Sequence, residues 1–547
     1  MTTNQELAEI FRGIADLLDL QGERFKPEAY RRAARSIESL PEDVRAIAAR
    51  GELHEVPGVG DAIAEKTEEF LSTGHIAYFD RLTTSVPAGV LEMMRLGGVG
   101  PKTARRFLVE FGIEGPAELS EAIATGRLNG VKGFGPRKLE LLQKAVARGT
   151  PTAKRTALFD AWSVARRLVD ELRHRAPLEK VEVAGSLRRR RESVGDLDIL
   201  VTSTTPEAVF DAFTHLPGVT EVTLRGPTKE TVVVDGKLQV DLRVVEPAAF
   251  GAALQYFTGS KDHNVRLRTL ARDHGLKVNE YGVFRGEERV AGATEEEVYR
   301  ALGLAWIPPE VRENQAEFDL ALAGRSPNLV AGEDLLGDFH VHLPPEPTIE
   351  EVDQRVREAG ERGWTLLGLV WRETDPHPRP ALVEHLRSLR SAGDRRPAVR
   401  LGVETAVGAT PTALDADYRV WDLTGLPSPP DGTPAATGVR FAAHLTLATP
   451  TQEASASAAQ TWVDWAKRRR LALEVGPRGA ADGLDSTGVH FAETAGVSLH
   501  LTAGVRSASD SFDPVELAVG LARRGWLSPA HAINREDPAG PTRGRAK

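Results

Sequence analysis

The stretch that decides the fold in the middle of the chain reads Gly185-Ser186-Leu187-Arg188-Arg189, then Gly195-Asp196-Leu197-Asp198-Ile199-Leu200. The apolar residues around the two aspartates predict a β-strand. Residues two apart in a strand point to the same face, so Asp196 and Asp198 share one face. Two carboxylates on one rigid strand can hold magnesium beside substrate phosphates. The stretch therefore predicts a centre for phosphoryl or nucleotidyl transfer.

Size and composition limit the remaining interpretation. A chain of 547 residues is too long for one hydrophobic core, so we expect several domains. The absence of cysteine excludes disulfides and thiolate zinc sites and favours a reducing, cytoplasmic location. Residues 1–20 carry the acidic, amphipathic pattern of a helix rather than a signal peptide. No apolar run approaches the roughly 20 residues of a membrane span.

Charge gives a weaker constraint. The formal net charge of -9 argues against a protein that coats nucleic acid non-specifically. It leaves room for local basic surfaces, and the run Arg188 to Arg191 and the pairs Arg31-Arg32 and Arg105-Arg106 are candidates.

A Gly-apolar-Gly turn occurs three times in the first 150 residues, which otherwise read as helical. The copies are Gly58-Val59-Gly60, Gly98-Val99-Gly100 and Gly133-Phe134-Gly135. A glycine turn ahead of a helix lets exposed backbone N–H groups approach a phosphate. Three copies favour sequence-independent binding to the DNA backbone through these glycines.

These turns resemble helix-hairpin-helix motifs. The resemblance implies contacts to DNA phosphates and a monovalent cation held by backbone carbonyls. One such cation would lie near His54, Val56 and Val59, and a second near Met94, Leu96 and Val99.

The segment from Tyr30 to Lys66 resembles the lyase domain of family X DNA polymerases. The resemblance implies that Lys66 attacks the aldehyde of an abasic sugar phosphate as a Schiff base and that Tyr30 lines the pocket and contacts DNA. Attack by an amine requires a neutral lysine. A basic residue often found one turn earlier in the family is Ala62 here, so the sequence leaves 5′-deoxyribose phosphate lyase activity open.

A β-hairpin is predicted for residues 231–243, where alternating apolar residues flank Asp235-Gly236. Pairing of this hairpin beside the first strand would bring Asp241 onto Asp196 and Asp198. The three carboxylates would then bind two divalent ions, Mg²⁺ or Mn²⁺.

The family X resemblance is strongest in this region and implies a role for each motif. One metal ion would lower the pKa of the primer 3′-hydroxyl, and the other would neutralise the β- and γ-phosphates of the incoming nucleotide. Asp196 and Asp198 would bridge both ions, and Asp241 would contact the ion at the primer end. Residues of the glycine turn would bind the triphosphate: Gly185, Ser186, Arg189 and Gly195.

Tyr256-Phe257-Thr258-Gly259-Ser260 and the following Asn264 resemble the nucleotide-selecting segment of the family. The resemblance implies that Tyr256, Phe257 and Gly259 line the nucleotide site, the aromatic pair lying against the sugar. Asn264 would read the minor-groove edge of the incoming base. Arg243 and Arg268 are expected to contact DNA, Arg268 on the template strand.

Gly337-Asp338-Phe339-His340-Val341-His342 would place two imidazoles on one face of a strand. The motif resembles the opening of a PHP (polymerase and histidinol phosphatase) domain. The resemblance implies a strand–helix barrel with up to three metal ions and 3′-to-5′ exonuclease activity. Glu404 and His444 match two further ligands of that family.

Several other ligand positions of the PHP pattern are lost. Residues that cannot bind a metal stand there: Trp371, Arg372, Ala503 and Val505. Since each ligand supplies both charge and geometry, we expect only a weak remnant site and an absent or vestigial exonuclease. The remnant would consist of His340, His342, Glu404 and His444.

We therefore expect a multidomain α+β protein with helical helix-hairpin-helix domains, a nucleotidyltransferase palm with a mixed sheet, and a C-terminal PHP-like β/α barrel. The predicted segments are a lyase-like domain 1–85, a second helix-hairpin-helix domain 86–150, a palm 151–245, a nucleotide-selection domain 246–320, a linker 321–335, a PHP-like domain 336–536 and a disordered tail 537–547.

The expected function is gap filling in base-excision or end-joining repair by a cytoplasmic monomer. Its partners would be gapped or nicked duplex DNA, deoxynucleoside triphosphates and repair proteins, without a membrane. Two alternatives stay open: a DNA gap-binding or end-binding scaffold with little catalysis, and a polymerase that retains a weak PHP exonuclease.

Overall fold

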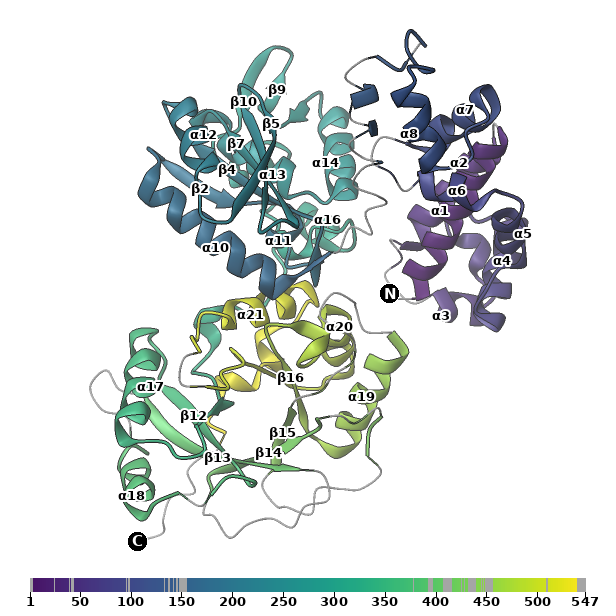
Figure 1. Ribbon diagram of the computed structural model, residues 1–547. Coiled ribbons are helices and arrows are strands. Elements are labelled where there is room, and N and C mark those ends of the chain that lie inside the picture. The colour runs from purple at the N-terminus through teal and green to yellow at the C-terminus, as the bar shows by residue number, and fades with distance from the viewer. Residues whose placement is uncertain are drawn as a thin grey trace. The chain divides into compact units, whose positions relative to one another are not determined.

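The protein is described as a computed structural model that divides into two compact units, Met1–Lys154 and Arg155–Lys547 (Figure 1). The described residues are 3–23, 25–38, 40, 44–94, 96, 99–131, 133–135, 138–140, 142–143, 146, 155–376, 378–391, 397–406, 416–424, 426, 428–430, 439–443, 445, 447, 456–507 and 510–538. Among them, no helix has the length and apolar character needed to cross a membrane.

The first unit consists of short helices over two hydrophobic clusters. One cluster gathers around Phe11 and Phe70, and the other around Phe107 and Phe134. The helices are α1 (Thr3–Gln21), α2 (Lys26–Glu38), α3 (Val44–Ala49), η1 (Leu53–Glu55), α4 (Asp61–Thr73), α5 (Ala77–Thr84), α6 (Ala88–Met94), α7 (Pro101–Phe111) and α8 (Pro116–Ala124). The helical N-terminal part of the expected fold class is confirmed.

The palm of the second unit is a five-stranded mixed sheet in the order β2-β4-β7-β6-β5. The β6–β7 hairpin turns at Asp235 and Gly236, both at positive φ, as an Asp-Gly turn requires. The elements are β1 (Thr156–Ala157), α10 (Leu158–Arg175), β2 (Lys180–Val183), α11 (Gly185–Arg188), β3 (Ser193–Val194), β4 (Asp196–Thr202), α12 (Pro206–Thr214), β5 (Val219–Arg225), β6 (Lys229–Val234) and β7 (Leu238–Val244).

The next segment packs helices against a small antiparallel sheet in the order β10-β9-β8. Its core includes Ala252, Val283, Tyr299 and Phe318. The elements are η2 (Pro247–Ala249), α13 (Phe250–Thr258), α14 (Lys261–Asp273), β8 (Lys277–Asn279), β9 (Gly282–Arg285), β10 (Glu288–Ala291), α15 (Glu295–Ala301), η3 (Pro309–Val311), α16 (Glu317–Leu322) and η4 (Gly332–Asp334).

The C-terminal part is a parallel sheet of seven strands paired in chain order from β11 to β17. Figure 1 shows β12 to β16 following an arc, with α17, α18 and α19 on its outer side. The elements are β11 (Val341–His342), α17 (Ile349–Glu361), β12 (Leu366–Arg372), α18 (Pro380–Ser388), β13 (Ala398–Ala406), β14 (Tyr418–Asp422), β15 (Val439–Ala443), α19 (Ala456–Arg469), β16 (Ala472–Val475), η5 (Gly479–Ala481), α20 (Ser486–Ala495), β17 (Leu499–Leu501), α21 (Val515–Arg524), η6 (Pro529–His531) and η7 (Ile533–Arg535).

The two ends of this curved sheet approach each other. The backbone N–H of His342 donates to the carbonyl of Val505 at 3.1 Å, and Thr502 Oγ1 donates to Asp338 Oδ2 at 3.0 Å. The parallel strands, the intervening helices and the contacts between the β11 region and the segment after β17 confirm the PHP-like β/α barrel of the expected fold class; we call this curved sheet and its helices the half-barrel.

The palm and the half-barrel share one continuous hydrophobic cluster, which includes Leu158 and Trp162 of α10 and Leu517 and Leu521 of α21. The segment predicted as a linker joins this core, because Val330 is fully buried and its N–H donates to the carbonyl of Leu527 at 2.8 Å.

The predicted disordered tail begins with a residue that is anchored. Asp537 accepts hydrogen bonds from Arg400 at 2.5 to 3.0 Å. Residues 539–547 lie outside the described residues.

Candidate active site and metal centres

The palm places the three predicted metal-binding aspartates on two neighbouring parallel strands. β4 and β7 pair so that Asp198 lies opposite Asp241, and Asp196 lies opposite Gln239. Paired residues on neighbouring strands, and residues two apart on one strand, point to the same face of a sheet. The hairpin thus brings all three carboxylates to one face.

Asp241 is held by its neighbours on the hairpin. Lys229 Nζ donates to Asp241 Oδ2 at 2.5 Å, Thr231 Oγ1 donates to Oδ1 at 2.8 Å, and Gln239 Nε2 approaches Oδ1 at 3.4 Å. The sequence analysis missed Lys229. The register of the hairpin could have revealed Lys229. β6 pairs Thr231 with Asp241 and Lys229 with Arg243, so Lys229 lies close to Asp241 on the neighbouring strand.

The electrostatics of the triad favour a bound cation. Burial, followed by the charges of Asp196 and Asp241, raises the pKa of Asp198 from 3.8 to about 7. Burial and Asp241 also raise the pKa of Asp196, although Lys229 and Arg155 oppose the shift. Like charges at one site resist simultaneous ionisation, and a divalent cation relieves that repulsion.

The glycine turn lies directly against this triad. Gly185 has φ +63°, and a Cβ there would come within 2.5 Å of Asp198 Oδ2. Only glycine allows both the backbone conformation and this close approach. Ser186 is half-buried and Gly195 is exposed. The predicted phosphate-binding turn and the first carboxylate pair therefore form one site.

The two arginines of the turn are engaged by the segment that follows the palm. Arg188 donates to both carboxylate oxygens of Glu295 at 2.8 Å and to Thr258 Oγ1 at 2.7 Å. Arg189 donates through Nε to Glu313 at 3.1 Å and through Nη1 to the Thr258 carbonyl. Triphosphate binding by Arg189 stays a prediction and would require Nη1 to leave that carbonyl. Glu295 and Glu313 were missed, because no local pattern links them to the turn.

The predicted nucleotide-selecting segment lies beside the same arginine. The rings of Tyr256 and Phe257 meet edge to face at 5.2 Å, and the Arg243 guanidinium lies 4.2 Å from the Phe257 ring centre. Gly259 has φ +70°, and a Cβ there would lie 3.2 Å from Arg189 Nη1. The aromatic pair and the triphosphate turn are thus neighbours.

Asn264 and Arg268 stand in hydrogen bonds within the protein. Asn264 accepts from Gln255 at 2.7 Å and donates to the Tyr256 carbonyl at 2.7 Å, and Arg268 donates to the Asn264 carbonyl at 3.2 Å. The base contact predicted for Asn264 and the template contact predicted for Arg268 stay predictions. Base recognition by Asn264 would require its amide to exchange partners.

The three glycine turns of the first unit repeat one backbone geometry. Each closes with an N–H to C=O bond three residues back: Val59 to Val56 at 3.0 Å, Val99 to Leu96 at 3.1 Å and Phe134 to Val131 at 2.9 Å. The last glycine of each turn then accepts the first N–H bonds of the next helix: Gly60, Gly100 and Gly135. Gly58 and Gly133 have φ near +90°, whereas Gly98 lies outside the described residues. The repeat seen in the sequence is therefore a structural repeat.

The predicted lyase residues lie near each other around Tyr78. Lys66 is half-buried, donates to the Ala62 carbonyl at 2.9 Å and lies 5.2 Å from the Tyr78 ring centre. Tyr30 is 7% exposed and stacks on Tyr78 with ring centres 6.4 Å apart. Burial raises the pKa of Tyr30 to about 12. Tyr30 is thus a core residue beside Tyr78, and its predicted contact with DNA stays a prediction.

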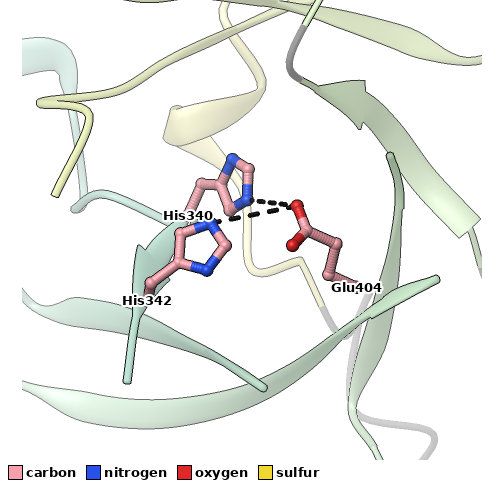
Figure 2. A group of neighbouring side chains, drawn as sticks. All are labelled: His340, His342 and Glu404. Atoms are coloured by element: carbon pink, nitrogen blue, oxygen red, sulfur yellow. Dashed lines mark hydrogen bonds and ion pairs between the residues drawn. The ribbon is translucent and has the colours of Figure 1, made fainter. Parts of the chain in front are cut away.

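The half-barrel holds a buried histidine–carboxylate cluster. His340 Nε2 lies 3.3 Å and His342 Nε2 lies 3.8 Å from Glu404 Oε1, as Figure 2 shows. The ligand atoms of these three residues lie within 4.8 Å of one another. His444, the fourth predicted ligand, lies outside the described residues.

Protein groups already compensate the charge of this cluster. His340 Nδ1 contacts Glu474 at 2.6 Å, and Arg372 Nε lies 3.6 Å from Glu404 Oε2. Burial alone would lower the pKa of His340, but Glu474 and Glu404 raise it to about 10. Glu474 was missed, because it lies on β16, far along the chain, and only the curvature of the sheet brings it to His340.

Known domain families match three parts of the chain. Residues 2–76 match the helix-hairpin-helix domain, residues 90–148 match the SAM-like helix-hairpin-helix tandem, and residues 253–313 match the DNA polymerase beta thumb. The first two matches cover the glycine turns, and the third covers the aromatic pair and Glu313.

Curated relatives align with more than half of the chain. The chain is 30% identical to the DNA polymerase/3′-5′ exonuclease PolX of Bacillus subtilis (strain 168), over 62% of this chain and 59% of that protein. It is 25% identical to DNA polymerase lambda of Rattus norvegicus, over 57% of this chain and 56% of that protein. It is 22% identical to DNA polymerase lambda of Arabidopsis thaliana, over 56% of this chain and 62% of that protein.

The chain spans less than two thirds of the length of each of these relatives. Along the chain, the domain matches follow in the order helix-hairpin-helix domain, helix-hairpin-helix tandem and polymerase thumb. By these matches the chain is similar to DNA polymerases of family X.

Proposed function

We propose that this protein is a template-directed DNA polymerase that fills short gaps during DNA repair. The observation that carries the proposal is the register of β4 and β7, which sets Asp196, Asp198 and Asp241 on one face beside the Gly185 turn. The thumb match and the polymerase relatives support it.

Two divalent ions, Mg²⁺ or Mn²⁺, fit the donor set of the palm. Carboxylate oxygens are the ligands that these ions prefer, and the raised pKa of Asp198 marks a place where a cation is favourable. Asp196 and Asp198 would hold both ions, and Asp241 would hold the ion near the primer. Bound ions of this kind activate a hydroxyl nucleophile and neutralise phosphate charge.

The residues around Asp241 define how it would take up an ion. Thr231 fixes Oδ1, whereas Lys229 occupies Oδ2 from a flexible side chain that is 25% exposed. A lysine ammonium can withdraw at small cost because its stem has many rotamers. We propose that Lys229 orients Asp241 and leaves Oδ2 when a divalent cation binds.

The substrate assignment rests on the first unit and on the segment after the palm. Three repeated glycine turns would bind the phosphate backbone of gapped or nicked duplex DNA. A monovalent cation would fit the carbonyls of the turns, at Val56 and Val59 and at Leu96 and Val99. The aromatic pair beside Arg189 would face the sugar of a deoxynucleoside triphosphate.

Single-nucleotide gap filling tests the proposal. Asp198→Asn removes one palm carboxylate without changing side-chain size and should lower incorporation by at least about 100-fold. Asp235→Asn is the matched control, because it changes an aspartate of the same sheet that forms only an exposed ion pair with Arg167. Equal incorporation by wild type and Asp198→Asn would refute the active site. Tight gap binding without incorporation by wild type would favour the scaffold alternative.

We also propose that the half-barrel has lost 3′-to-5′ exonuclease activity. His340, His342 and Glu404 fit a single metal ion, but Arg372 lies at the carboxylate of Glu404 and the backbone of Val505 lies against His342. A multi-metal hydrolytic site needs further ligands where these residues stand. Metal-dependent 3′-to-5′ exonuclease activity of the wild type that is lost in His340→Ala would contradict the proposal.

A further inference from the structure

The last helix of the half-barrel reaches the nucleotide turn of the palm. Arg524, at the end of α21, donates through Nη1 to Glu313 Oε1 at 2.7 Å. Its Nε lies 3.8 Å from Glu192 Oε2, and the Arg524 side chain is only 10% exposed. Glu192 stands between the arginines of the glycine turn and the strand of Asp196 and Asp198. One arginine therefore contacts carboxylates on both sides of the turn.

Glu313 connects Arg524 to Arg189. The same oxygen, Glu313 Oε1, accepts hydrogen bonds from Arg524 and from Arg189 Nε, the latter at 3.1 Å. Burial favours the neutral acid, but Arg524 and Arg189 lower the pKa of Glu313 to about 2. Glu313 is therefore ionised, and its position depends on both guanidinium groups.

The other end of the turn is fixed in the same way. Glu192 Oε1 accepts hydrogen bonds from the hydroxyl and the backbone N–H of Ser486, at the start of α20. Burial would raise the pKa of Glu192, but Arg524 and Arg191 lower it. The half-barrel thus holds Glu192 with a hydroxyl and a guanidinium, both from helices that pack on the palm.

We infer that Arg524 is a positioning residue for nucleotide binding: through Glu313 and Glu192 it sets the place of Arg189 and of the Gly185 turn. The inference rests on the proposed polymerase function and gives the half-barrel a role that needs no metal in its own cluster. Because Glu313 binds Nε of Arg189, it orients the guanidinium plane, and a planar fork binds phosphate only from a suitable orientation.

Kinetics with the full-length protein test this relay. Arg524→Ala should raise KM for the deoxynucleoside triphosphate roughly tenfold, because a buried charge-assisted hydrogen bond is lost, and should leave KM for gapped DNA within twofold. Arg524→Lys keeps the charge but loses the fork and should give a smaller rise. Arg523→Ala is the control, because the neighbouring Arg523 pairs with Glu310 at the same interface at 2.9 Å and does not contact the turn.

A double-mutant cycle separates positioning from general stabilisation. In an Arg189→Ala background, Arg524→Ala should raise KM for the nucleotide clearly less than it does in the wild-type background, because the part of its effect that Glu313 transmits acts through the Arg189 side chain. An unchanged KM in Arg524→Ala, equal effects of Arg523→Ala, or full additivity with Arg189→Ala would overturn the inference. If Arg524→Ala does not fold, the same cycle with Arg524→Lys decides. Absence of incorporation by wild type would instead refute the proposed function.

Discussion

The pKa of Asp198 predicts how the stability of the metal-free protein depends on pH. The folded chain raises this pKa from 3.8 to about 7, so between these values the folded carboxyl keeps a proton that the unfolded chain releases. A raised carboxyl pKa contributes stability at low pH that is lost as the pH rises towards the folded pKa. In EDTA, the second unit should therefore be less stable at pH 8 than at pH 5.

The structure sets the size of this effect. At pH 5 the unfolded carboxyl is already ionised, so only the part of the shift between pH 5 and the folded pKa of about 7 counts, which corresponds to about 2.7 kcal/mol. The partial exposure of Asp198 reduces the expected contribution to about 1.3 kcal/mol. For a unit of this size, that difference lowers the unfolding temperature by about 1 to 2 °C between pH 5 and pH 8.

Differential scanning calorimetry of wild type and Asp198→Asn isolates the contribution. Asparagine resembles the protonated acid and cannot ionise, so wild type should lose about 1 to 2 °C more than the variant between the two pH values. The comparison also cancels other groups with raised pKa, such as Asp482, whose pKa burial and Glu474 raise to about 7.

Divalent cations should reverse this behaviour. At saturating Mn²⁺, the ion binds the ionised carboxylates, so wild type should become more stable as the pH rises, whereas Asp198→Asn should respond weakly. Identical pH profiles for wild type and Asp198→Asn, with and without Mn²⁺, would refute the electrostatic account of the palm site.

Three further predictions concern other parts of the chain. Gly185→Ala places a Cβ 2.5 Å from Asp198 Oδ2 at φ +63°. It should lower incorporation at least tenfold, measured by gap filling, and should lower the free energy of unfolding by ~1–2 kcal/mol, measured by calorimetry. Unchanged activity would contradict the close approach. If Lys66 forms a Schiff base, borohydride should trap a covalent adduct with a 5′-deoxyribose phosphate end in wild type but not in Lys66→Ala, and no adduct in either would exclude lyase activity. Arg372→His removes the guanidinium that lies 3.6 Å from Glu404. In an Asp198→Asn background, calorimetric titration should show an about tenfold higher affinity of the half-barrel for Mn²⁺. An unchanged affinity would contradict the view that Arg372 opposes metal binding at Glu404.

The sequence was sufficient for the palm because its signals are local. The i, i+2 spacing of Asp196 and Asp198 and the Asp235-Gly236 turn depend only on strand periodicity and turn chemistry. They predicted the β6–β7 hairpin beside β4, and the structure has this pairing. The glycine turns were recognisable for the same reason, since each is one short backbone motif.

The ion pairs that hold the site together have no comparable local signal. Arg188 meets Glu295, and Glu313 meets both Arg189 and Arg524, across separations of more than 100 residues. Such contacts follow from the packing of helices onto the palm. The predicted linker also shows this limit, because its polar composition did not reveal that Val330 enters the shared core.

The three palm aspartates are proposed to catalyse the incorporation of the nucleotide that is complementary to the template base. The most direct measurement is incorporation into a set of single-nucleotide gaps that differ only in the template base, with each of the four deoxynucleoside triphosphates and Mg²⁺ or Mn²⁺. Wild type and Asp235→Asn should insert the complementary nucleotide in each gap, and Asp241→Asn should insert none at a comparable rate. Incorporation that ignores the template base, or that survives Asp241→Asn, would contradict the account.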